Sequence, residues 1–109
     1  MAHNIPKPTI MADQQGTITS INPEFSEAFG WLATDLVGKS LTTIIPSNMH
    51  DAHNLGFSRF MLTKIPTLLD KEIKLNIITK DGRSLEATHV ISALENDGQW
   101  TFVATITPH

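Results

Sequence analysis

Two tight turns near the end of the chain place the strongest constraint on its fold. Residues 80–83 and 95–98 each contain an Asp-Gly pair, which is typical of short β-hairpin connections. The segments beside these turns, 72–79, 84–94 and 100–107, are predicted strands because β-branched residues are frequent in them. Connections this short leave no room for a crossover, so the three strands are expected to be antiparallel.

A second hairpin is predicted near the N-terminus. Residues 9–12 are apolar, residues 13–16 form a turn in which Gly16 can take a positive φ, and residues 17–21 alternate polar and apolar side chains. Such alternation is the period of a strand with one buried face. The sequence therefore predicts five strands, two before the helical region and three after it.

Short helical segments are predicted between the two groups of strands. Asn22 and Pro23 are typical of a helix start, and Gly30 is typical of a helix end. Two further short turns are expected at 34–38 and 40–45, where each segment is bounded by a residue that caps or breaks helices.

The longest helix is expected between Pro46 and Pro66. Apolar side chains recur there at steps of three and four residues, which is the period of a helix with one buried face. The residues of this apolar stripe are Met49, Ala52, His53, Gly56, Phe57, Phe60 and Met61.

Strands grouped around a helical region predict an α+β fold. We expect a five-stranded antiparallel sheet with short helices and one longer helix packed on one face. The 109 residues suffice for one domain, which we place at 9–107 after an N-terminal extension at 1–8.

Composition argues against several classes of protein. The net charge of -3 does not favour binding to nucleic acid or to an anionic membrane surface, and apolar runs are far shorter than the roughly 20 residues of a transmembrane helix. The absence of Cys excludes disulfides and thiol chemistry, and it fits a cytoplasmic protein. No catalytic motif such as G-x-S-x-G occurs, so we do not expect an enzyme.

Several short motifs occur in the order typical of PAS sensory domains, which this sequence resembles from about residue 9 to residue 107. They are D-x-x-G-x-I-x-x-x-N-P at 13–23, N-x-x-F-x-x-x-x-G-W at 22–31, Leu-Val-Gly-Lys at 36–39, Ile-Pro at 45–46 and Lys-Asp-Gly at 80–82. The sequence departs from the family at its end, where Pro108 and His109 replace the usual acidic, hydrophobic and Thr residues that lead to an output helix.

The resemblance implies a sensory module of a signal-transduction protein. PAS domains hold a cofactor or small ligand between their helices and sheet, or keep that space packed and serve as cofactor-free dimerisation and protein-interaction modules. The resemblance also implies an output domain in a longer receptor and a homodimer formed through the sheet. Apolar residues on the outward face of the predicted sheet, Val90, Leu94 and Val103, favour that dimer.

His53 lies within the apolar stripe of the longest predicted helix, so it is expected to face the core. A buried imidazole needs either a hydrogen-bond partner or a metal. Together with Pro46, Arg59 and Phe60, His53 matches the spacing of PAS oxygen sensors that bind heme b, in which this His is the proximal iron ligand. The alternative is a core His bonded to a protein group. His50 lies one step before the stripe and is expected to face solvent.

His89 is the second candidate ligand. Alternation along the strand puts it on the same face as Ala87 and Ile91, toward the helices, where it could bind heme iron or hydrogen-bond to a bound gas. It could also bond to a backbone carbonyl, or lie on the surface if the alternation is misassigned. The arginine that stabilises oxygen in the heme sensors falls at Ile73 here. If heme binds, the apolar stripe with Phe57 and Phe60 is expected to enclose it together with Leu68, Leu69 and Ile91. Arg59 could reach a heme propionate or be a solvated helix residue.

Overall fold

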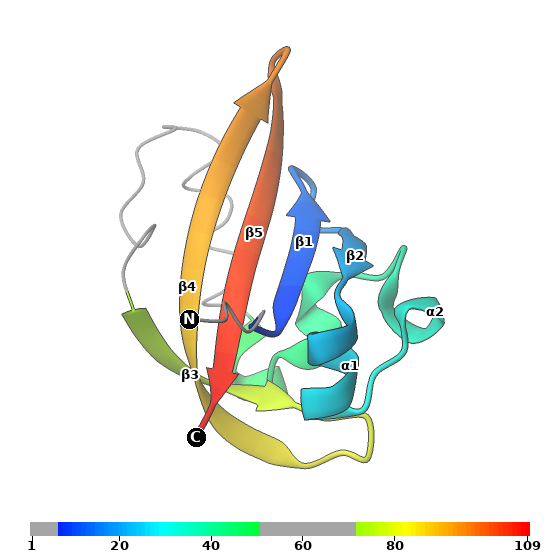
Figure 1. The fold of residues 1–109 in the computed structure, drawn as a ribbon, viewed down its shortest axis with the longest axis vertical. Coiled ribbons are helices and arrows are strands. Elements are labelled where there is room, and N and C mark those ends of the chain that lie inside the picture. The colour runs from blue at the N-terminus through cyan, green and yellow to red at the C-terminus, as the bar shows by residue number, and fades with distance from the viewer. Residues whose placement is uncertain (1–6, 51–71) are drawn as a thin grey trace, which may run out of the picture.

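The computed structural model describes residues 7–50 and 72–109, and it contains one antiparallel sheet with short helices (Figure 1). In chain order the elements are β1 (Thr9–Asp13), β2 (Ile18–Ile21), α1 (Pro23–Phe29), α2 (Ala33–Leu36), the 3-10 helices η1 (Leu41–Ile44) and η2 (Ser47–Met49), β3 (Glu72–Ile78), β4 (Ser84–Asn96) and β5 (Gln99–Pro108).

The sheet joins the two ends of the chain. Its strand order is β2-β1-β5-β4-β3, and every neighbouring pair is antiparallel. The N-terminal hairpin therefore completes the sheet through pairing of β1 with β5, while β5, β4 and β3 form the predicted C-terminal meander. The predicted α+β fold with a five-stranded antiparallel sheet is confirmed.

The Asp-Gly turn between β4 and β5 connects two long strands. Asp97 and Gly98 have φ values of 53° and 79°, and Asn96 pairs directly with Gln99. Positive φ at both central residues gives the turn the twist that a two-residue hairpin needs. The two strands thus continue closer to the turn than the sequence predicts, and β4 reaches Asn96.

Helix α1 begins where the sequence predicts, at the cap formed by Asn22. The Asn22 side chain also connects this helix to the sheet. Asn22 Oδ1 accepts hydrogen bonds from the backbone N–H groups of Phe25 and Thr9, both at 2.9 Å. Its Nδ2 donates to the carbonyl of Lys7 at 2.8 Å. One amide therefore caps α1 and holds the first residues of β1. The helix ends at Gly30, whose φ of 81° is readily accessible to glycine.

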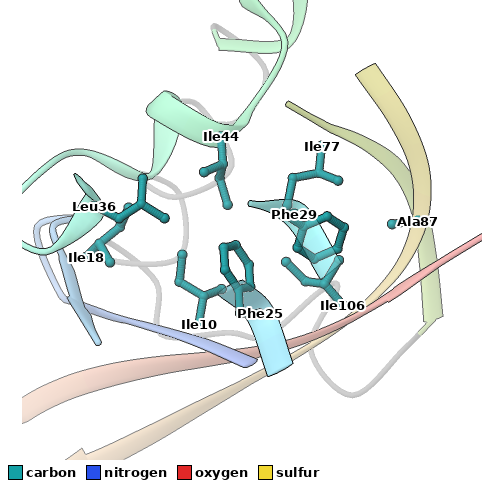
Figure 2. Packing of buried hydrophobic residues seen from close by; sticks show 9 residues of the cluster. All are labelled: Ile10, Ile18, Phe25, Phe29, Leu36, Ile44, Ile77, Ala87 and Ile106. Atoms are coloured by element: carbon teal, nitrogen blue, oxygen red, sulfur yellow. The ribbon is translucent and has the colours of Figure 1, made fainter. Parts of the chain in front are cut away.

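The hydrophobic core lies between α1 and one face of the sheet. Phe25 and Phe29 are fully buried and meet edge to face, with ring centroids 5.0 Å apart. Figure 2 shows both rings directed toward isoleucines from other elements. The whole cluster consists of Ile10, Ile18, Phe25, Phe29, Leu36, Ile44, Ile77, Ala87 and Ile106.

A second set of contacts joins α1 and α2 to the turn between β3 and β4. The Trp31 indole donates to the Ile78 carbonyl at 2.9 Å, and the Lys80 backbone N–H donates to the Phe29 carbonyl at 3.0 Å. Lys80 Nζ lies 2.9 Å from an Asp35 carboxylate oxygen and 5.4 Å from the centroid of the Trp31 ring. Helix α1 is therefore held at both ends, by Asn22 at its start and by the contacts of Phe29 and Trp31 at its end.

The predicted longest helix falls largely outside the described residues. Its first residues, Ser47–Met49, form the 3-10 helix η2. Among the helices in 7–50 and 72–109, none is long and apolar enough to cross a membrane.

Truncating Phe25 to Ala should lower the free energy of unfolding by about 3–5 kcal/mol, because it leaves a cavity where a fully buried ring contacts Phe29. Glu27→Ala, at an exposed position of the same helix, should change it little. Urea denaturation of both variants measures the difference. Equal losses would contradict this placement of α1.

Candidate functional site

The candidate site lies on the face of β3, β4 and β5 that points toward the core. Opposite His89 on β4 are Ile73 on β3 and Ile106 on β5. Ala87 and His89 are buried, and Ile91 is half-buried on the same face. The predicted alternation along β4 is therefore correct for the described strand, and His89 lies on the inner face.

Two polar side chains are buried in the described part of the chain, and they differ in their partners. Thr79, 2% exposed, bonds to Asp81 and to the backbone of Arg83 within the turn that follows β3. His89 is 8% exposed, yet its Nε2 has no hydrogen-bond partner among the described residues. Buried polar atoms without a partner are rare in folded proteins, and they are frequently functional.

Burial lowers the pKa of His89 below its ordinary value of 6.5, because the apolar surroundings disfavour the charged ring. A hydrogen bond with the backbone of Leu75 raises the pKa by a smaller amount. The ring is therefore neutral at pH 7, which is the state in which an imidazole can bind a metal or accept a hydrogen bond.

Ile91, another predicted site residue, follows His89 on the inner face of β4. His53, Phe57, Arg59, Phe60, Leu68 and Leu69 fall outside the described residues, so their predicted contacts with a cofactor remain predictions.

His50 differs from its expected position. It is half-buried rather than facing solvent, and its Nε2 lies 2.7 Å from the carbonyl oxygen of Ile45. This bond closes the turn that contains Pro46. The helical period of the sequence alone does not predict such a bond.

A groove of about 470 Å³ borders β3, which is an edge strand of the sheet. Its lining residues are Pro46, Asn48, Met49, Lys74, Leu75, Asn76 and Ser84. Leu75 belongs both to this groove and to the surroundings of the His89 ring. The sequence does not predict this groove, because η2 and β3 are distant in sequence and only the folded chain brings them together.

The opposite face of the sheet carries apolar side chains among polar ones. Val103 on β5 pairs with Met11 on β1 and with Ser92 on β4, and Val90 on β4 pairs with Thr105 on β5. Leu94, further along β4, is 58% exposed. The predicted outward placement of Val90, Leu94 and Val103 is correct.

The model of the PAS fold family matches residues 1–108. The chain belongs to the PAS family. This agrees with its five-stranded sheet and with the motifs that resemble the family. The search of curated proteins found no match.

Solved PAS domains have the same fold at low sequence identity. A PAS domain from Desulfitobacterium hafniense is 15% identical with a TM-score of 0.77, and the match covers 96% of this chain and 94% of that one. The PAS domain of the RpfR quorum-sensing receptor from Cronobacter turicensis, in complex with C12:0, is 14% identical with a TM-score of 0.75, covering 99% and 98%.

A PAS domain from a two-component sensor histidine kinase is 11% identical with a TM-score of 0.74, covering 94% of this chain and 85% of that one. These likenesses establish the PAS fold, and they do not single out the heme-binding sensors.

Replacing His89 with Leu tests whether its Nε2 is unpaired. Above pH 7 we expect His89→Leu to be at least as stable as the wild type, because the change removes a buried nitrogen that has no partner in the described part of the chain. A core His with both nitrogens bonded would instead lose about 1–3 kcal/mol on this substitution. Urea denaturation distinguishes the two results.

The same variant should alter the pH dependence of stability. Because the pKa of His89 is lower in the folded than in the unfolded state, the unfolded chain binds the proton more readily. The contribution of His89 to stability is complete above pH 6.5 and decreases as the pH falls through the lowered value. His89→Leu should therefore gain stability relative to the wild type below pH 6.5, and an unchanged difference would contradict the lowered pKa.

Proposed function

We propose that this PAS domain is the sensory module of a signal-transduction protein and holds a small ligand or cofactor on the inner face of its sheet, at His89. The observation that carries the proposal is the buried Nε2 without a partner in the described part of the chain. The RpfR PAS domain in complex with C12:0 supports it, because that domain has the same fold and binds a small molecule.

The specific cofactor that we propose is heme b, with His53 as the proximal ligand and His89 as a second ligand. A neutral imidazole whose Nε2 has no partner within 7–50 and 72–109 fits an iron ligand, and Ile73, Ile91 and Ile106 give it apolar neighbours. In this proposal Arg59, which matches the spacing of the heme sensors, binds a heme propionate. Bound heme would supply an iron centre for gas binding or redox chemistry.

Titration of the purified domain with hemin tests this proposal. We expect a Soret band at one heme per chain, which His53→Ala abolishes or greatly weakens. His89→Ala should convert a six-coordinate low-spin ferrous iron into a five-coordinate one. His50→Ala is the matched control, since the His50 Nε2 is bonded to Ile45, and it should retain the heme.

Stoichiometric heme binding that survives His53→Ala would remove His53 from the assignment. A domain that stays colourless with added hemin would rule out heme and leave either another small ligand or the cofactor-free interaction module.

The proposal includes a longer receptor. The domain itself would have no catalytic activity, and it would act in the cytoplasm by passing a ligand-dependent change to an output domain. The similarity to a PAS domain from a sensor histidine kinase supports such an arrangement.

The proposal also includes a homodimer formed through the outer face of the sheet. Met11, Val90 and Val103 lie there, and a second copy would cover these partly exposed apolar side chains. The same three side chains favour the alternative function, in which the domain only mediates interactions between proteins.

Val103→Glu should weaken the dimer without unfolding the chain, because its cross-strand neighbours Met11 and Ser92 carry no charge and the core lies on the other face. Thr34→Glu, at an exposed position in α2, is the control and should not change association. Analytical ultracentrifugation should show the wild-type dimer at high micromolar chain concentration or below. A wild type that is monomeric at millimolar concentration would contradict the dimer.

A further inference from the structure

The two edges of the described sheet differ in how their backbone groups are used. At the β2 edge, the Ile18 N–H donates to the Lys39 carbonyl and the Gly38 N–H donates to the Ile18 carbonyl, both at 2.8 Å. The segment that follows α2 therefore covers the edge of β2. Strand β3 forms the other edge, and within the described sheet it pairs with β4 alone. Uncovered strand edges can pair with another chain.

The pairing of β3 with β4 fixes which backbone groups of β3 point away from the sheet. The Thr79 N–H donates to the Arg83 carbonyl at 2.8 Å, one step beyond the last residue pair of the two strands. Hydrogen-bonded and non-hydrogen-bonded pairs alternate along an antiparallel ladder. The N–H and C=O groups of Lys74, Asn76 and Ile78 therefore point toward the open edge.

The Ile78 carbonyl agrees with this direction, because it accepts the Trp31 indole N–H at 2.9 Å from outside the ladder. The corresponding groups of Lys74 and Asn76 have no backbone partner among residues 7–50 and 72–109. Both residues are exposed, and both line the groove beside η2. This edge thus offers two N–H groups and two carbonyls to the groove, at the two-residue spacing of a β-ladder.

The side chains along the groove alternate as the strand alternates its faces. Lys74 and Asn76 share one face of β3, and Leu75 lies on the other. Leu75 and Met49 contribute apolar surface, and Lys74 is the charged side chain of the described lining. Lys74 forms no ion pair with a described residue. The groove therefore combines one unpaired positive charge with an apolar position one residue away.

We propose that the edge of β3 binds an extended peptide of a partner protein as an additional antiparallel strand. The peptide carries an acidic side chain opposite Lys74 and an apolar side chain opposite Leu75, because directly opposed residues share a face. The antiparallel direction follows the other strand pairs of this sheet. Main-chain bonds give such strand addition its affinity, and side chains at alternate positions give it selectivity. This interface does not depend on a ligand at His89.

Two capped peptides test the inference by titration of the 109-residue chain at pH 7, followed by its amide NMR shifts. They are acetyl-Thr-Val-Glu-Val-Thr-amide and the same peptide with Lys in place of Glu. We expect shifts along β3, and about fivefold tighter binding of the Glu peptide, the ratio that one cross-strand charge pair gives. Lys74→Glu should reverse the preference. Lys39→Glu, at an exposed position that does not line the groove, is the matched control and should retain it.

N-methylated peptides separate main-chain pairing from adhesion of the apolar side chains. In the proposed pairing the N–H of the Glu residue faces Lys74, whereas the N–H groups of the two Val residues face away from β3. A methyl group on the Glu nitrogen should weaken binding about tenfold or more, because it removes a hydrogen bond and holds the strands apart. The same group on a Val nitrogen is the matched control and should change binding much less.

Equal binding of the Glu and Lys peptides would overturn the inference, and so would a preference that survives Lys74→Glu. Binding that tolerates the methyl group on the Glu nitrogen, or shifts confined to residues away from β3, contradicts strand addition. A chain that binds neither peptide at millimolar concentration also contradicts it. Hemin titration tests the proposed sensory function separately, since neither peptide occupies the inner face.

Discussion

The register between β4 and β5 is the constraint on which the rest of this structure depends. Asp97 and Gly98 close a two-residue turn, and the pairing that starts there continues along both strands to Pro108. Side chains alternate between the two faces of a sheet, so a shift by one residue would exchange the faces. The turn thereby places His89 on the inner face and Val90 on the outer one, and both parts of the proposed function follow from this register.

Local sequence signals predicted much of the fold. The Asp-Gly turns, the alternation around His89 and the Asn22-Pro23 helix start each act within a few residues, and each is present in the structure. The pairing of β1 with β5 joins residues far apart in sequence, so the antiparallel sheet was expected but its strand order could not be derived from local patterns.

The candidate site was predicted only in part, for a related reason. Alternation along β4 identifies His89 as inward-facing, but its lowered pKa and the unpartnered Nε2 in the described part of the chain depend on neighbours from other strands. The groove between η2 and β3 and the bond from His50 to Ile45 likewise depend on tertiary placement. Composition and the periodicity of apolar residues carry no information on such contacts, because these form only when distant segments pack together.

His89 is a neutral, buried imidazole whose Nε2 has no partner among the described residues, and we propose that this nitrogen binds a ligand. Nitrogen-15 NMR of the His89 ring across a pH titration of the ligand-free domain tests it most directly. We expect a ring that is neutral at pH 7, with a pKa below 6.5. A ring that is charged at pH 7, or a pKa at or above 6.5, would contradict it.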